Sequence, residues 1–369
     1  MAEHGDYIPA YRTIRVTAPE APVAALADLE AWKAREPYPD LLSAGGPVFG
    51  VAVEREAGGW ELRAHLSNPE PQGARDSMAM CLRKLAHDAE EAGDEDARAE
   101  YQQAAERLDW ETLDDLTVRG VRYRVIRTEQ FIRMGPEGPE PPRPTDPDPA
   151  PTGRSHRFPD PTEGFVVDPI FPTGMSEGIL LLELLALVPR PGSVPEDVRA
   201  HALRAARTHP GGVLLPPTFM IAENDGQGWR PDSAGVATSP QAARDQLSFN
   251  LRVMAPVTHR LNQAERAAYT RAADRLDKRR GNDVHLPDDR HLRVARVERL
   301  LRIGPDGPEG PRPCDIDSQL PVMVQEEQLR AEGRLPPDEN TPIELDEDGK
   351  EMSRLLDLEE QRRARLYGD

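Results

Sequence analysis

The pentapeptide Gly174–Gly178 carries the clearest catalytic signal in the chain, because GMSEG fits the G-x-S-x-G pattern. In serine hydrolases this turn presents a nucleophilic serine between a buried strand and a helix. FVVDPIF before the turn and ILLLELLALV after it are candidates for that strand and helix. Pro169 and Pro172 interrupt the supposed strand, so we interpret Ser176 as part of a Gly-Ser turn. A serine hydrolase acting through Ser176 is kept as the lowest alternative. Acids and histidines that lie downstream are Asp197, His201, His209 and His259.

One short segment has enough histidine and aspartate to suggest a metal site. His285, Asp288, Asp289 and His291 are dense, but their spacing is loose and no second cluster accompanies them. We interpret the segment as a polar loop before a strand and expect no metal site. We also expect no cofactor, because the chain has no P-loop, no dinucleotide-binding glycine motif, no H-E-x-x-H and no C-x-x-C.

Two matching sets of arginine and glutamate suggest a ligand site. Alternation along a strand places the members of each set on one face. Where two such faces meet, the arginines can bind a carboxylate or phosphate with two hydrogen bonds. The alternative is a solvated face or a ladder of ion pairs between strands. The residues are Arg127, Glu129 and Arg133 in one set and Arg296, Glu298 and Arg302 in the other.

Many motifs of the chain occur twice at one spacing, which indicates an internal duplication. Trp60 and Trp229 each follow a glycine, and a PQxARD motif follows each tryptophan, at 71–76 and at 240–245. RAEYQQAAERLD and VIRTEQFIRMGPEGPEPPRPTD recur as RAAYTRAADRLD and VARVERLLRIGPDGPEGPRPCD. The spacing is 169 residues and becomes 168 only around the third predicted helix.

Both halves predict the same series of elements. In the first half the patterns predict a strand in YRTIRV, a helix in PVAALADLEAWKARE and a hairpin of PVFGVAVERE with WELRAHL. Two helices and the strand VRYRVIRTEQFIRM follow. In the second half ILLLELLALV fits a strand, although it also permits a buried helix, and Pro216 and Pro217 should bend the strand VLLPPTFMIAEN. The order matches a ferredoxin-like pattern with its second helix doubled, βαββααβ. We therefore expect an α+β fold of two tandem repeats packed as an intramolecular pseudo-dimer.

Proline-rich segments divide the chain. We predict a first α+β repeat over 1–146, a proline-rich linker over 147–172, a second repeat over 173–320 and an acidic tail with a C-terminal helix over 321–369. The motif GPxGPExPRPxD closes both repeats, so we expect each copy of it to pack on its own repeat.

The composition narrows the function further. The chain has 369 residues and a formal charge of −19, from 46 Lys and Arg against 65 Asp and Glu, which argues against a nucleic-acid or anionic-membrane partner. Cys81 and Cys314 are too few for a disulfide scaffold. The longest apolar run is about half of a membrane span, and the first residues do not form a signal peptide. We expect a cytoplasmic protein.

The repeated motif, at Met134–Asp146 and Ile303–Asp315, resembles the hallmark of a family of uncharacterised actinobacterial proteins with a domain of unknown function. The resemblance covers about Tyr11 to Leu320 and implies no activity, cofactor or site residue. With no catalytic constellation in the sequence, our first hypothesis is a non-catalytic interaction or scaffold protein with a protein partner. The alternative is a pseudo-dimer, either a small-molecule binder or an enzyme, whose site lies in a polar Arg/Glu cleft between the repeats.

Overall fold

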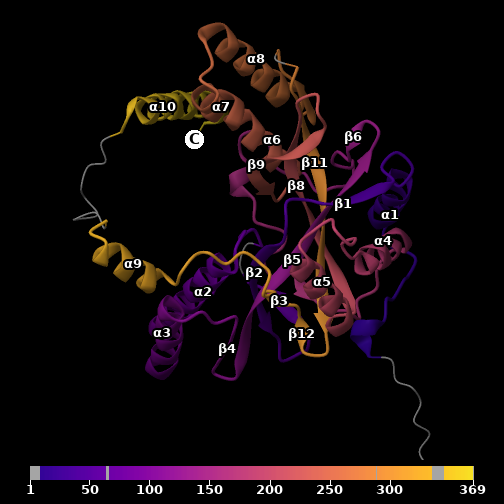
Figure 1. The fold of residues 1–369 in the computed structure, drawn as a ribbon, viewed down its shortest axis with the longest axis vertical. Helices are drawn as coiled ribbons and strands as arrows, with labels where there is room; N and C mark the ends of the chain where they lie inside the picture. Colours follow the sequence, from indigo (N-terminus) through magenta and orange to yellow (C-terminus); the bar gives the residue numbers. More distant parts are fainter. Residues whose placement is uncertain (1–8, 64–65, 288, 335–344, 369) are drawn as a thin grey trace, which may run out of the picture.

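The computed structural model describes residues 9–63, 66–287, 289–334 and 345–368. They form a mixed α+β fold around one large curled antiparallel sheet (Figure 1). The strands of the main path run in the order β7-β3-β2-β5-β11-β8-β9. The long strands β5 (Val121–Gly135) and β11 (His291–Gly304) lie in the middle of this path and pair with each other.

The N-terminal part supplies one side of the sheet. The hairpin predicted around Trp60 is confirmed, because β2 pairs with β3 in antiparallel register and β2 then pairs with β5. Two short strands that the sequence did not predict, β1 and β4, also pair with β5. The bounds of these elements are α1 (Pro22–Ala34), β1 (Asp40–Ser43), β2 (Val48–Glu54), β3 (Trp60–Leu62), α2 (Pro71–Ala92), α3 (Glu95–Trp110), β4 (Asp115–Val118) and β6 (Gly138–Pro139).

The C-terminal part supplies the other side. β8 pairs with β11 along most of its length, and the register shifts next to Pro216 and Pro217, so the predicted bend is present as a bulge. The bounds are β7 (Val166–Val167), α4 (Met175–Ala186), α5 (Glu196–Thr208), β8 (Gly211–Asn224), β9 (Trp229–Ala237), α6 (Pro240–Phe249), a π-helical turn (Asn250–Met254), α7 (Ala255–Thr258), α8 (Gln263–Arg279), β10 (Asp283–His285) and β12 (Gly307–Pro308). Two further helices follow, α9 (Val322–Ala331) and the predicted C-terminal helix α10 (Glu347–Tyr367).

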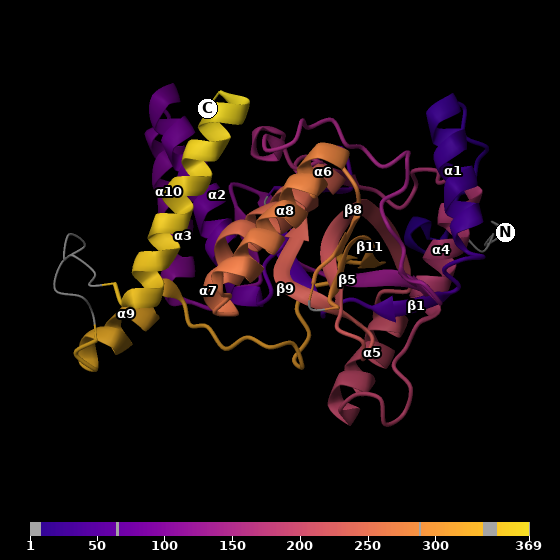
Figure 2. The ribbon, with the colours of Figure 1, turned by 90° about the horizontal axis from the view of Figure 1, so that it is seen from above.

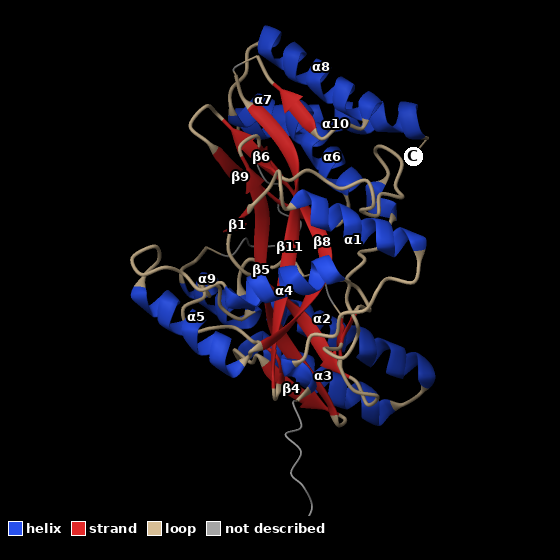
Figure 3. Cartoon of the chain, turned by 90° about the vertical axis from the view of Figure 1, so that its right-hand side faces the viewer, coloured by secondary structure: helices blue, strands red, loops and turns tan. Residues whose placement is uncertain are grey.

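The helices gather at the two ends of the sheet. Figure 3 shows α2 and α3 at one end and α6, α8 and α10 at the other. Each end has its own apolar core, centred on Phe49, Met78 and Leu82 in one case and on Phe219, Leu247 and Tyr269 in the other. α1 and α4 lie between the two ends (Figure 3), on the opposite side of the molecule from α9 and α10 (Figure 2).

The predicted ferredoxin-like order is not confirmed. The segment YRTIRV contains the end of a short 3₁₀ helix (Ala10–Arg12) and then a single bridge from Val16 to Thr173, in place of the expected strand. ILLLELLALV forms most of the helix α4, the second of the two structures that its composition permits. Within the described part of the chain, no helix is both long enough and apolar enough to cross a membrane.

Candidate functional site

The central strand pair brings the two predicted Arg/Glu sets together. In the register of β5 with β11, Glu129 lies opposite Leu300 and Glu298 lies opposite Phe131. Residues directly opposite in an antiparallel pair share a face, so both glutamates point to the same side of the sheet. Arg302 donates from Nε to Oε2 of Glu129 at 3.3 Å, which joins one set to the other.

Two arms cross this face of the sheet. We call residues 135–150 the first arm and residues 304–319 the second arm. The backbone N–H of Arg296 donates to the carbonyl of Glu140 at 2.8 Å, and that of Arg127 donates to the carbonyl of Glu309 at 2.9 Å. Each arm therefore bonds to the central strand of the other half. The expectation that each motif packs on its own half is wrong.

The carboxylates of the arms pair with the predicted arginines. Asp315 of the second arm accepts from Arg127 Nε at 3.0 Å, and Asp146 of the first arm accepts from Arg296 Nε at 3.0 Å. In return, an arginine of each arm pairs with a central glutamate: Arg143 with Glu298 at 3.3 Å and Arg312 with Glu129 at 3.0 Å. The arms therefore fill the face on which the sequence placed a polar cleft, and four of the six charges predicted there pair with arm residues.

Burial and charge oppose each other in this network. Burial favours the neutral form of Glu298, but Arg296 and Arg143 outweigh it and hold the pKa of that carboxyl below its ordinary value. The pKa of Glu129 is lowered in the same way, with burial opposed by Arg312 and Arg127. Burial also opposes the charge of Arg296, yet Glu298 and Asp146 raise its pKa above the ordinary value.

A glycine and a tryptophan fix where each arm crosses. Gly307 has φ +101° and lies against the indole of Trp60, so an added Cβ would come within 2.6 Å of the ring. Gly138 has φ +109° and lies against Trp229, where a Cβ would come within 2.4 Å. The two contacts join residues with the same 169-residue spacing, and both lack room for any larger side chain.

The end of each arm binds the PQxARD helix of the other half. Asp317 of the second arm accepts from the N–H of Gln72 at 3.2 Å and from Arg75 at 2.7 Å, at the first turn of α2. Asp148 of the first arm accepts from the N–H of Gln241 at 2.8 Å and pairs with Arg244 at the first turn of α6. These carboxylates cap the helix ends where backbone N–H groups lack partners.

Arg133 differs from the other members of the two sets. Its side chain is 4% exposed, and the nearest carboxylate is Glu183, with Nη2 and Oε2 3.5 Å apart. The other oxygen of Glu183 is taken by Arg35 at 2.5 Å. Among the described residues, Nε of Arg133 has no hydrogen-bond acceptor. Burial lowers the pKa of this guanidinium, although Glu298, Glu140 and Glu183 act in the opposite direction.

Arg302, which corresponds to Arg133 at the 169-residue spacing, is better supplied with acceptors. It donates to Glu129 and also to the backbone carbonyls of Leu184 and Leu185 at the end of α4, the latter at 3.1 Å. No carbonyl of the described residues plays this part for Arg133. The two arginines therefore occupy matched places in the sheet with unequal surroundings.

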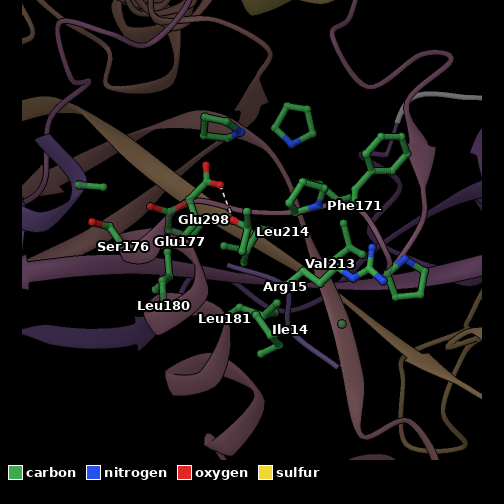
Figure 4. Close-up of a pocket in the computed structure, with 18 of the residues that line it drawn as sticks. Ile14, Arg15, Phe171, Ser176, Glu177, Leu180, Leu181, Val213, Leu214 and Glu298 are labelled. Carbon is green, nitrogen blue, oxygen red and sulfur yellow. Dashed lines mark hydrogen bonds between the residues drawn. The ribbon is translucent and has the colours of Figure 1, made fainter. Parts of the chain in front are cut away.

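A cavity of about 370 Å³ lies beside Arg133. Its walls come from α4, β8, the segments 13–15 and 165–173, and the central strands. Arg143, Arg296 and Glu298 also line it, whereas Arg127, Glu129 and Arg302 do not. Figure 4 shows Ser176, Glu177 and Glu298 at one end of the cavity and Arg15 and Phe171 at the other. Apolar side chains from α4, β8 and the N-terminal segment complete the wall, among them Ile14, Leu180, Leu181, Val213 and Leu214.

Ser176 lies on the wall of this cavity, but its hydroxyl is engaged. Oγ donates to the backbone carbonyl of Asp28 at 2.7 Å, and a carboxylate oxygen of Asp28 accepts from the N–H of Ser176 at 2.8 Å. Asp28 thereby caps the first turn of α4. None of the described histidines hydrogen-bonds to Ser176, and the strand before the turn, β7, has only two residues. This is the geometry of a helix start, without the base that a nucleophilic serine needs.

The predicted polar loop at 285–291 has no converging metal ligands. His285 and His291 stack with ring centroids 4.0 Å apart, and Asp283 pairs with His291 at 2.7 Å. Asp288 lies outside the described residues. Within the described ranges, no group of three or more His, Cys, Asp or Glu is arranged to hold a metal ion. Cys81 and Cys314 are free thiols.

A known protein family covers this whole arrangement. A family of unknown function, DUF5954, matches residues 21–318. The chain belongs to this family. No curated protein and no solved structure matches the chain. The DUF5954 match includes both arms, both PQxARD helices and the central strands, and α9 and α10 lie outside it.

Sequence reasoning missed the residues of the arms. Glu140, Arg143 and Asp146, and their counterparts Glu309, Arg312 and Asp315, pair with the central strands or with each other. The signal was present, because the charged positions of GPxGPExPRPxD are the same in both copies. Opposite charge in the arm and in the strand set could have suggested that the two pair.

Proposed function

We propose that this chain binds a small ligand with a carboxylate or phosphate group in the cavity beside Arg133. One observation carries the proposal: Arg133 is buried on the cavity wall with too few acceptors for its five N–H donors. Leaving a buried charge without full pairing costs several kcal/mol. An anion in the cavity would supply the missing acceptors, and the planar guanidinium suits a carboxylate or phosphate.

The rest of the cavity suits an anion that carries a short apolar body. Its volume of about 370 Å³ lies at the lower end of the range for small-molecule sites. The leucines of α4 and the apolar residues of β8 provide contacts for the apolar part, and Arg133 orients the charged group. Because Ser176 is engaged by Asp28, the arrangement favours binding over hydrolysis.

The test is the thermal stability of the full-length protein with added anions. Inorganic phosphate and short-chain carboxylates from acetate to hexanoate should raise Tm with concentration, because a ligand that binds only the native state stabilises it. Arg133→Gln should abolish the shift, and the exposed control Arg190→Gln should keep it. An equal shift in Arg133→Gln, or no shift for any of these anions, would rule the site out.

The first hypothesis from the sequence, an interaction or scaffold protein, stays a prediction. It rested in part on arms free to dock on partners. Because the charged side chains of both arms pair within the chain, the contacts favour the ligand-binding alternative. A serine hydrolase at Ser176 is the weakest alternative, and failure of a fluorophosphonate to label the folded protein would remove it.

The domain organisation that we propose is two tandem copies of one α+β unit, packed as an intramolecular pseudo-dimer. Support comes from contacts that repeat at the 169-residue spacing. Val297 pairs with Ile132 and Leu301 pairs with Thr128, so the strand register is unchanged when the two copies are exchanged. Gln130 and Arg299, which correspond to each other, pair at the centre of this register.

A further inference from the structure

α1 turns an apolar side to solvent. Leu26, Leu29 and Trp32 lie three residues apart, and this spacing places them on one side of the helix. The sequence pattern alone would assign that side to the core. In the structure these three side chains are 49%, 45% and 52% exposed, and Ala34 is the one residue of α1 that is buried.

α4 adds a second apolar stripe beside the first. The two helices run side by side in the same direction, since Asp28 bonds to Ser176 and Arg35 pairs with Glu183 one and a half to two turns further on. Met175 and Leu182 of α4 are 56% and 58% exposed, and Phe171, just before α4, is 67% exposed. We call the combined surface the α1/α4 patch; it consists of Leu26, Leu29, Trp32, Phe171, Met175 and Leu182.

The patch is free of acidic side chains, in a chain whose charge is −19. The acids of the two helices are held on other sides. Asp28 caps α4, Glu30 accepts from Thr145, and Glu183 accepts from Arg35. Glu177 accepts from the hydroxyl of Thr173. The strong negative charge of the whole molecule is therefore kept away from this one surface.

We propose that the α1/α4 patch is the contact surface between two copies of this chain. The six side chains expose on the order of 700 Å², close to the ~800 Å² that each partner contributes to a standard interface. A monomer rarely leaves so large an apolar patch uncovered. A two-fold dimer needs only self-complementary surfaces, and two layers of paired helices with apolar outer stripes meet that need. Trp32 has the size and position expected of a central anchor.

The experiment is a measurement of the mass of the full-length protein in solution at micromolar concentration, by light scattering after gel filtration and by sedimentation equilibrium. The wild-type protein should have twice the chain mass of 40.9 kDa. Leu29→Glu and Leu182→Glu place a charge in the patch without touching the core, so each should shift the equilibrium to monomer. Met80→Glu is the matched control, because Met80 is 66% exposed on α2, outside the patch.

Circular dichroism of each variant confirms that the fold is kept. A wild-type protein that stays monomeric throughout the micromolar range would overturn the proposal. So would a dimer that survives both patch variants, or a patch that captures a different protein while the wild-type chain shows no self-association. The proposal does not depend on the anion site, because none of the variants alters Arg133.

Discussion

At the scale of single residues, the most demanding positions are the two glycines that lie against tryptophan. Gly138 and Gly307 combine a positive φ with an indole ring in the space where a Cβ would be. Either feature alone excludes most side chains. Together they explain why glycine occupies both copies of the arm at this point, whatever ligand the protein binds.

Gly307→Ala is expected to lower the free energy of unfolding by about 2–4 kcal/mol, from backbone strain and from the clash with Trp60. Gly58→Ala is the matched control, because Gly58 has φ +88° but no atom near its would-be Cβ. It should cost about 1–2 kcal/mol, the backbone contribution alone. Urea unfolding of both variants measures the difference, and equal losses would show that the contact with Trp60 contributes nothing.

At the scale of elements, the arms act as connectors between parts that are distant in sequence. Asp317 reaches the first turn of α2, some 240 residues earlier in the chain, and so ties the second arm to the helix layer of the first half. Arg75, the partner of Asp317, also pairs with Asp114 at 2.8 Å, just before β4. The start of α2 is thus held from two directions.

Asp317→Ala should destabilise the protein by about 2 kcal/mol, since it removes both a helix cap and a charged hydrogen bond to a buried arginine. Asp88→Ala, at an exposed position of the same helix, should change stability by less than about 0.5 kcal/mol. Hydrogen exchange should speed up in the first turn of α2 for Asp317→Ala. Unchanged exchange there, despite a loss of stability, would contradict the capping role.

The elements also show where sequence patterns succeed and where they stop. Alternation in VRYRVIRTEQFIRM predicted the strand β5 and the common face of Arg127 and Glu129, because a strand fixes side-chain direction locally. The helical spacing of Leu26, Leu29 and Trp32 predicted α1 but not its exposed apolar side, which depends on what packs elsewhere. The crossing of the arms was missed for the same reason: the partners of Asp146 and Asp315 are set by tertiary structure, about 150 to 190 residues away.

At the scale of the whole molecule, the buried ionic network joins the two halves. Glu129 and Glu298 lie at the junction, and both have a pKa below the ordinary value of 4.5. A carboxyl with a depressed folded-state pKa binds protons more readily in the unfolded state. It therefore contributes stability that is fully present above about 4.5 and is lost as the pH falls through the folded-state pKa.

The free energy of unfolding should accordingly change little on account of these two groups between pH 7 and pH 5 and fall below pH 4.5. A Glu129→Gln, Glu298→Gln double variant should be less stable at pH 7, because its arginines lose their partners. It should also show a shallower decline in acid, since two of the protonating groups are gone. Guanidinium unfolding at a series of pH values gives both quantities, and an unchanged acid slope would count against the network.

The crossing of the arms has a consequence for the order in which the chain acquires its structure. During synthesis the strand β5 leaves the ribosome long before the second arm exists, so the guanidinium of Arg127 must wait for Asp315. Until residue 315 has emerged, the N-terminal half carries unpaired charge on the face that will be interior. Nascent chains that stop short of that point should therefore remain loosely structured and dependent on chaperones, and the final fold forms late, after nearly the whole domain has been translated.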